Sequence, residues 1–194
     1  MTSGTTVDAP AVARPVWLGP VLRAVPAILV GLAITFTADH SALLGLVMLS
    51  IFGLGSTLAL LVTSVRLERS EPLRGLHHAL ALIAGVVGAA SAVAAATLGS
   101  ALPVLLLLIG GYAVLAGALE LVWGIRHRDR SPFARDGMII GVGTLALAVV
   151  LALVADPVSA VGFFGAYAVV LGVFLVIAGL SARWAAASSE ESAS

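Results

Sequence analysis

Six apolar stretches, each about 20 residues long, constrain this chain more than any other feature. They run over residues 16–38, 42–65, 79–98, 101–125, 137–155 and 158–182. A helix rises about 1.5 Å per residue, so about 20 residues cross the roughly 30 Å of hydrocarbon in a bilayer. Hydrophobic residues make up 60% of the chain and charged residues only 10%, whereas a soluble domain carries about 25% charged residues. A soluble enzyme is therefore excluded, and the sequence predicts an all-α integral membrane bundle of six helices.

The regions outside these stretches set the predicted domain limits. Residues 1–15 and 185–194 are mostly small or polar, so we expect both segments to be poorly ordered, on either side of a single transmembrane domain over residues 16–184. The first stretch contains Arg23 and Pro26. Arg23 is expected to snorkel from one end of this helix to the lipid headgroups. A secretory signal peptide is the alternative for this stretch, but its apolar run is long and no clear A-x-A cleavage site follows.

The basic residues indicate how the helices cross the membrane. All ten are Arg, and they fall before or near the start of the first stretch, between the second and third, between the fourth and fifth, and after the sixth. The other three connections, around residues 39–40, 99–100 and 156–157, contain no Arg. Positively charged loops stay on the cytoplasmic side. We therefore expect a protein of the bacterial plasma (inner) membrane with both termini in the cytoplasm.

The short outer turns predict three helical hairpins of one orientation, made by helices one and two, three and four, and five and six. The fourth stretch matches the sixth at an offset of 55 residues, and the second follows more loosely at an offset of 60. We therefore expect repeats over about residues 16–65, 79–125 and 137–182, related by a pseudo-threefold axis along the membrane normal. The second, fourth and sixth helices are the predicted inner set.

Small residues recur every seven positions along these three inner helices. This spacing keeps them on one face of a supercoiled helix, where a neighbouring backbone can approach closely. The general abundance of Gly in membrane helices is the alternative explanation. Gly45 lies off the series and is expected to matter less for packing. The predicted packing stripe consists of Ser50, Thr57, Ser64, Gly110, Gly117, Gly124, Gly165, Gly172 and Gly179.

The repeated pattern G-[GA]-Y-x(4)-G-x(6)-G, followed by an Arg-bearing loop, resembles the HdeD-like acid-resistance membrane proteins. Asp156 and Pro157 at an outer turn also resemble that family, whereas the turn of the first hairpin has no Pro. The resemblance implies a small six-helix inner-membrane protein linked to acid stress. It transfers no catalytic residue, because the biochemical activity of that family is not well defined.

Residues that could carry chemistry are few. The chain has no Cys, which excludes disulfides and thiolate metal sites, and no phosphate loop or nucleophile with a paired base appears. The net charge is zero, which argues against a nucleic-acid partner. We therefore expect a non-enzymatic protein with no catalytic, cofactor or metal residues, acting in acid or envelope stress tolerance or as an accessory subunit. Its expected partners are membrane lipids and a second copy or another membrane protein. A small-solute or proton transporter or channel is the alternative.

Glu120 is the only acidic residue within the six apolar stretches, and ionisable residues inside membrane spans are functional candidates. We expect its carboxyl to be buried, to be partnered by Arg66, Arg183 or a hydroxyl of a neighbouring helix, and to serve chiefly in packing. A proton or ligand site is the alternative role. Tyr112 and Tyr167 are the other candidate polar residues.

Two further groups have simpler expected roles. His77 and His78, adjacent at the start of the third helix, are expected to be a polar pair at the membrane interface. Trp17, Trp123 and Trp184 lie near the predicted cytoplasmic boundary, where indole rings anchor membrane proteins.

Overall fold

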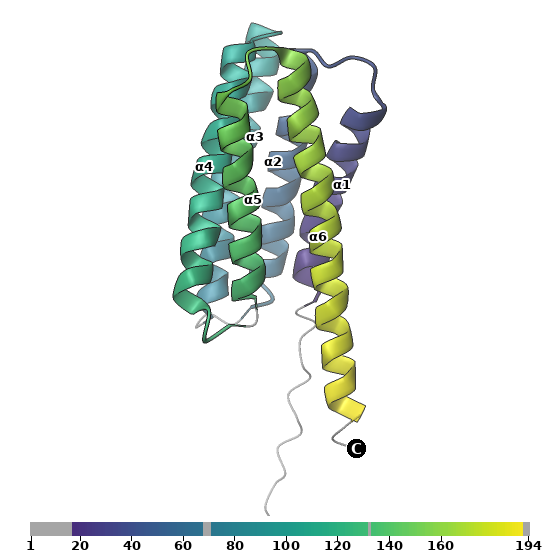
Figure 1. The fold of residues 1–194 in the computed structure, drawn as a ribbon, viewed down its shortest axis with the longest axis vertical. Helices are drawn as coiled ribbons and strands as arrows, with labels where there is room; N and C mark the ends of the chain where they lie inside the picture. Colours follow the sequence, from purple (N-terminus) through teal and green to yellow (C-terminus); the bar gives the residue numbers. More distant parts are fainter. Residues whose placement is uncertain (1–16, 68–70, 132, 192–194) are drawn as a thin grey trace, which may run out of the picture.

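A computed structural model describes residues 17–67, 71–131 and 133–191. The chain forms six helices: α1 (Leu18–Phe36), α2 (Ala42–Ser64), α3 (Pro72–Leu98), α4 (Leu102–His127), α5 (Ala134–Ala152) and α6 (Pro157–Glu191) (Figure 1). All six are long and apolar enough to cross a membrane, which confirms the prediction of an all-α, multi-pass membrane protein. The disorder predicted for residues 1–15 lies outside the described residues. Helix α6 continues about two turns beyond residue 184, the predicted end of the transmembrane domain.

Every helix exposes large apolar side chains away from its neighbours. In water such a surface would drive aggregation, whereas in hydrocarbon it is the expected outer surface of a bundle. One example from each helix, with an exposed fraction between 62% and 72%, is given by Leu29, Leu58, Leu82, Leu107, Val149 and Val170.

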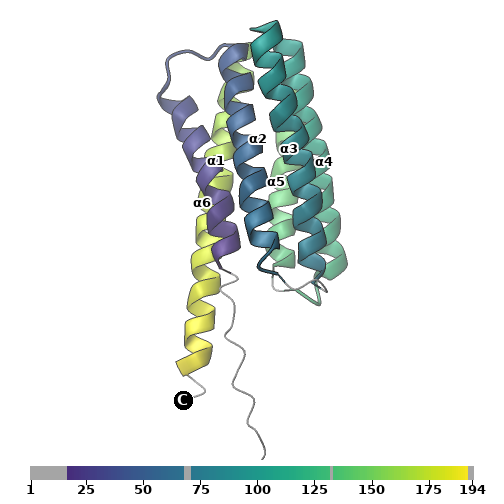
Figure 2. The same ribbon diagram turned by 180° about the vertical axis from the view of Figure 1, so that it is seen from behind.

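The helices run up and down, so their connections gather at two ends (Figures 1 and 2). We call the lower end in Figure 1 the basic end, because the loops and helix ends there carry Arg66, Arg74, Arg126, Arg128, Arg130, Arg135 and Arg183. We call the opposite end the turn end. Its connections contain Asp39, His40 and Asp156, and no described Arg.

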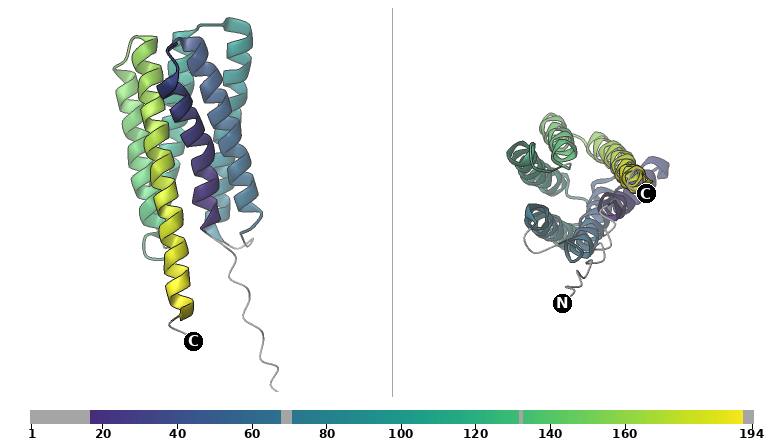
Figure 3. Two further views of the ribbon diagram at one scale, coloured as in Figure 1. Left: turned by 90° about the vertical axis from the view of Figure 1, so that its right-hand side faces the viewer. Right: turned by 90° about the horizontal axis from the view of Figure 1, so that it is seen from below.

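The closest packing joins α2 to α3, α4 to α5 and α1 to α6 (Figure 3). The prediction that the helices group as α1–α2, α3–α4 and α5–α6 is therefore wrong. In each close pair an even-numbered helix packs against the odd-numbered helix that follows it, with α1 taking the place after α6.

Glycines account for this pairing. A Cβ atom at Gly53 of α2 would lie 2.6 Å from the backbone oxygen of Ala84 on α3, and one at Gly141 of α5 would lie 2.5 Å from the backbone nitrogen of Leu121 on α4. Backbones can approach this closely only where a side chain is absent, and such approach is a main source of helix association in lipid. Short connections make two helices neighbours in the sequence. Which helices pack tightly depends instead on where their backbones can approach closely.

The centre of the bundle is formed by α2, α4 and α6, which all contact one another, while the backbones of α1, α3 and α5 do not meet one another in the described ranges. This is the inner set that the small-residue pattern predicted. The ring of Phe52 packs edge-to-face against Tyr112, at a centroid distance of 5.5 Å, and against Phe164, at 5.6 Å. We call these three rings the aromatic cluster. Side chains at the turn end of this cluster, among them Leu49 and Leu105, are fully buried.

Candidate functional site

A cavity of about 480 Å³ lies in the basic half of the bundle, and all six helices contribute to its wall. This volume falls within the range of about 300–1,000 Å³ that is typical of small-molecule sites. Leucines, including Leu22, Leu73, Leu76 and Leu175, make much of the wall apolar. The polar side chains that line it are Arg23, Thr63, Arg66, His77, Glu120, Trp123 and Asp136.

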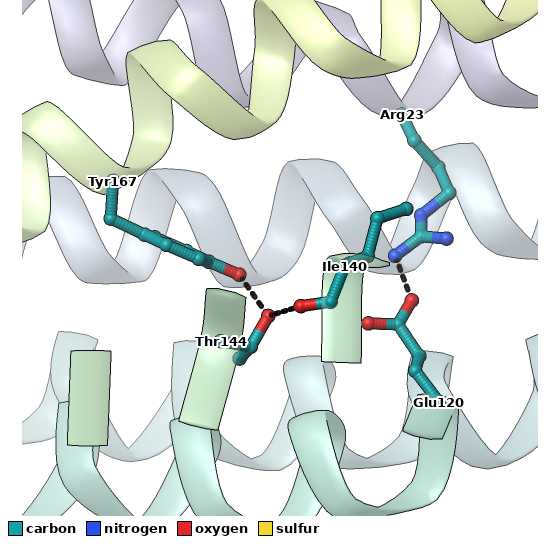
Figure 4. Close-up of polar contacts among 5 residues, drawn as sticks. All are labelled: Arg23, Glu120, Ile140, Thr144 and Tyr167. Atoms are coloured by element: carbon teal, nitrogen blue, oxygen red, sulfur yellow. Dashed lines mark hydrogen bonds and ion pairs between the residues drawn. The ribbon is translucent and has the colours of Figure 1, made fainter. Parts of the chain in front are cut away.

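Arg23 of α1 and Glu120 of α4 form an ion pair in this cavity (Figure 4). Arg23 Nη2 donates to Glu120 Oε1 at 2.7 Å, and the two side chains are 14% and 3% exposed. Glu120 is thus buried and partnered, but its partner is none of the groups that the sequence indicated. The prediction that Arg23 snorkels to the headgroups is wrong, because a buried carboxylate in a membrane requires a partner and Arg23 supplies it.

The ion pair leaves part of each group unused. A guanidinium has five N–H donors and a carboxylate has two acceptor oxygens, yet Arg23 and Glu120 make no hydrogen bond to any described residue except each other. Neither contributes to the set of fully buried, unpartnered polar atoms. The second carboxylate oxygen and the remaining guanidinium N–H groups are therefore accessible from the cavity.

His77 and Trp123 also line the cavity and are only 6% and 8% exposed. His77 Nδ1 and Trp123 Nε1 are buried and have no hydrogen-bond partner among the described residues. The expectations of an interfacial His77 and a boundary anchor at Trp123 are therefore wrong. His78 is exposed, and its Nδ1 lies 2.8 Å from Arg74 O, because successive side chains of a helix point about 100° apart.

The two other tryptophans differ from Trp123. Trp184 is 69% exposed, as a boundary anchor should be. The guanidinium of Arg183 lies 5.2 Å from the centroid of the Trp17 ring, which is a cation–π contact.

Tyr112 and Tyr167 do not line the cavity. Tyr112 belongs to the aromatic cluster, whereas Tyr167 Oη lies 2.8 Å from Thr144 Oγ1 (Figure 4). Thr144 donates its hydroxyl proton to the backbone oxygen of Ile140 at 2.7 Å, so Tyr167 is the donor to Thr144. This hydroxyl chain connects α6 to α5. Of the three candidate polar residues, only Glu120 therefore belongs to the cavity.

Five of the six glycines of the packing stripe face the helices with which α4 and α6 pair. A Cβ atom at Gly117 would lie 3.0 Å from Gly141 O, and one at Gly124 would lie 2.7 Å from Ala134 O, both on α5. On α6, Gly165, Gly172 and Gly179 face Ile34, Ile28 and Val21 of α1.

On α2, the stripe residues are less uniform. Thr57 Oγ1 lies 3.1 Å from Ala81 O, and Ser64 Oγ lies 3.5 Å from His78 Nε2, both on α3, while Ser50 is buried.

Two glycines do not behave as the stripe predicts. A Cβ atom at Gly110 would meet nothing within 4 Å, although Gly110 belongs to the series. Gly45, which was expected to matter less, is buried at the bundle centre, and a Cβ atom there would lie 2.6 Å from Leu105 Cδ2 and 2.9 Å from Val161 Cγ2. Sevenfold spacing identifies the paired faces of α4 and α6 but misses the contacts that the inner helices make with one another.

No family model, curated protein or solved structure matches this chain. The similarity to HdeD-like proteins therefore has no support beyond the sequence motifs that carry it. In the ranges that the structure describes, no group of three or more His, Asp or Glu residues is placed to hold a metal ion. The function has to be argued from the cavity and its ion pair.

Proposed function

We propose that this chain is a non-enzymatic, multi-pass protein of the bacterial plasma membrane, of the HdeD-like kind, which acts in acid or envelope stress tolerance or as an accessory subunit. The observation that carries the proposal is the state of the deepest charges in the cavity. Arg23 and Glu120 neutralise each other at 2.7 Å, and within the described chain no hydroxyl is hydrogen-bonded to Glu120 or to the Nδ1 of His77. A nucleophile would require such a contact with a base. The hydroxyl of Ser64 does lie 3.5 Å from His78 Nε2, but it donates to Leu61 O, and neither residue lines the cavity.

The distribution of charge supports the proposed orientation. The described arginines of the loops and helix termini lie at the basic end, and the connections of the turn end carry Asp39 and Asp156. With the basic end in the cytoplasm, the positive-inside rule is satisfied in every described connection. The repeated pairing of an even-numbered helix with the next odd-numbered one supports descent from three repeats about a pseudo-threefold axis.

The orientation is tested by reporter fusions. A reporter fused after Ser100 is expected to be active only outside the cytoplasm, and one fused to the C-terminus only inside. Activity of both fusions on the same side of the membrane would contradict the topology.

The role in stress is tested in the native host. Deletion of the gene is expected to lower survival after exposure to acid or to an envelope-damaging detergent. Both the unaltered protein and the Glu120→Gln variant should restore survival, because the amide keeps the size and most of the hydrogen bonding of the carboxyl. A deletion strain that survives both stresses like its parent would refute this role. If only the Glu120→Gln variant fails to restore survival, the carboxyl of Glu120 is itself required for function.

A transporter is the second candidate, and the one-sided position of the cavity favours it. Carriers bind their substrate near mid-membrane and present the site to one side at a time. The cavity occupies the basic half of the bundle, while the aromatic cluster and buried leucines fill its centre towards the turn end. Proteoliposomes that take up protons or small solutes faster than empty liposomes, with the excess lost in Arg23→Gln, would establish this second function in place of the first.

A further inference from the structure

We propose that the cavity binds a small, net-neutral amphipathic molecule whose polar end places a hydrogen-bond donor beside an acceptor, as a carboxamide or a zwitterion does. The acceptor would bind to Arg23, the donor would bind to Glu120, and the apolar body would lie against the leucine wall. This inference goes beyond the proposed function, since it applies equally to an accessory subunit and to a carrier.

The arrangement of the ion pair carries the argument. Arg23 and Glu120 are joined through one donor and one acceptor only, and their unused N–H groups and oxygen are accessible from the cavity. A donor and an acceptor therefore lie side by side against a largely apolar wall. An occupant with the complementary pair can bond to both at once, whereas an occupant with only one of them leaves a buried group unsatisfied.

Charge balance decides against an ionic ligand. The charged residues that line the cavity are Arg23, Arg66, Glu120 and Asp136, so the formal positive and negative charges are equal in number with His77 neutral. A ligand with a net charge would introduce an uncompensated charge beside a buried pair, which is costly where water is scarce. A zwitterion or a neutral amide keeps the balance.

Two unpartnered nitrogens lie within the cavity wall beneath its accessible surface. Buried polar atoms are hydrogen-bonded in the great majority of cases, and His77 Nδ1 and Trp123 Nε1 are exceptions on the wall of one cavity. Both side chains are more than nine-tenths buried. These two nitrogens have almost no accessible surface of their own, so the polar end of the ligand is assigned to Arg23 and Glu120, whose unused groups are accessible.

The experiment uses three probes that share an apolar tail: octanamide, octanoate and octylammonium. The full-length protein is placed in phosphatidylcholine nanodiscs, because the quaternary headgroup of that lipid has no N–H donor for Glu120. The changes Trp17→Phe and Trp184→Phe leave Trp123, in the cavity wall, as the only tryptophan, and its fluorescence reports binding. Empty nanodiscs correct for partitioning of each probe into lipid.

Octanamide is expected to bind at least about tenfold more tightly than either ionic probe, the ratio that one unsatisfied buried group produces. Glu120→Gln should shift the preference towards octanoate, and Arg23→Gln should shift it towards octylammonium. Asp39→Asn, at the turn end, is the matched control and should change nothing. Equal binding of all three probes, or a preference that neither cavity variant moves, would overturn the proposal.

A variant outside the ion pair guards against loss of folding. Ala178→Phe places a ring in the cavity from α6 and should abolish the fluorescence response to octanamide while the melting temperature is retained. Saturable binding of octanamide to a folded Ala178→Phe variant would place the site elsewhere and overturn the proposal.

The same assay shows whether the natural occupant of the cavity is a lipid headgroup or a free solute. If a lipid headgroup is the occupant, phosphatidylethanolamine in the nanodiscs should weaken octanamide binding about tenfold, since its ammonium and phosphate provide the donor and the acceptor. Phosphatidylglycerol should have no such effect. If neither lipid competes and octanamide still binds selectively, the occupant is a free solute of the same chemistry.

Discussion

Arg23 and Glu120, separated by 97 positions in the sequence, connect two helices whose backbones do not meet. Their 2.7 Å ion pair is a direct link between α1 and α4 across the cavity, because in the described ranges α1 packs only against α2 and α6. The charges are thus not a local feature of either helix.

Removal of Arg23 should destabilise the protein more than removal of Glu120. In Arg23→Met the short carboxylate of Glu120 stays buried without a partner, and we expect a loss of about 3 kcal/mol in the free energy of unfolding. In Glu120→Leu the loss should be smaller, because the long side chain of Arg23 lies near the start of α1 and can reach the headgroups by snorkelling. At offsets of 60 and 55 residues from Glu120, the sequence has Leu60 and Leu175, and both side chains are buried.

The double variant completes the cycle. Arg23→Met with Glu120→Leu replaces an ion pair with apolar side chains of similar size, which is often neutral or stabilising. We expect it to be more stable than Arg23→Met alone, with a coupling energy of about 1–3 kcal/mol. Thermal unfolding in one detergent measures all four proteins, and additive losses would show that the pair does not contribute as a unit.

Two glycines of the same stripe and the same helix should respond differently to alanine. At Gly117 a Cβ atom would lie 3.0 Å from the backbone oxygen of Gly141, and at Gly110 it would meet nothing within 4 Å. Gly117→Ala should therefore separate α4 from α5 and cost about 1–3 kcal/mol, while Gly110→Ala should be neutral or slightly stabilising. Unfolding temperatures in detergent provide the comparison, and equal values would show that this face is not a tight interface.

Gly45 is expected to be as sensitive as the stripe. Leucine at this position would meet Leu105, which is 0% exposed, and Val161, which is also fully buried. Because neither neighbour has free space to move into, Gly45→Leu should lower the free energy of unfolding by about 1–3 kcal/mol. Gly162→Leu on α6 is the control, since a Cβ atom there would meet nothing within 4 Å. A melting temperature for Gly45→Leu equal to that of the control would contradict the central packing of α2 against α4 and α6.

Asp156 should make stability depend on pH at the turn end. Ser159 N donates to Asp156 Oδ1 at 2.8 Å, and this hydrogen bond lowers the pKa of the Asp156 carboxyl below its usual 3.8. The folded state holds the proton less tightly than the unfolded state. The hydrogen bond from Ser159 to Asp156, which caps the start of α6, therefore contributes its full stability above the unfolded pKa. It is lost as the pH falls through the lower folded pKa.

The Asp156→Asn variant isolates this contribution. The amide retains an acceptor at the start of α6 but does not titrate, so the difference in melting temperature between the two proteins should change only below about pH 4. A difference that stays constant down to about pH 2 would show that the hydrogen bond from Ser159 to Asp156 does not respond to acidity.

The candidate site shows where prediction from sequence ends. Glu120 stands out because an acidic residue inside an apolar stretch is rare and costly, and the structure buries it as expected. Its partner could not be found in the same way. Arg23 lies near the start of its helix, where an arginine that snorkels and one that turns inward have the same local sequence, and only the position of α1 relative to α4 distinguishes them. For the same reason, the sequence predicts a boundary anchor at Trp123, whereas the structure buries this side chain in the bundle.

The sequence by itself determined the six helices and their direction across the bundle. A segment in hydrocarbon must satisfy its own backbone hydrogen bonds, so about 20 apolar residues are sufficient to specify a helix without reference to the rest of the chain. Only the tertiary structure decided which helices pair and what lies between them. Lipid tails are as apolar as the side chains of the helices, and hydrophobicity therefore does not select partners. The pairing of helices is decided instead by contacts such as those of Gly53 with Ala84 and of Arg23 with Glu120. Such contacts form only when segments distant in the sequence meet.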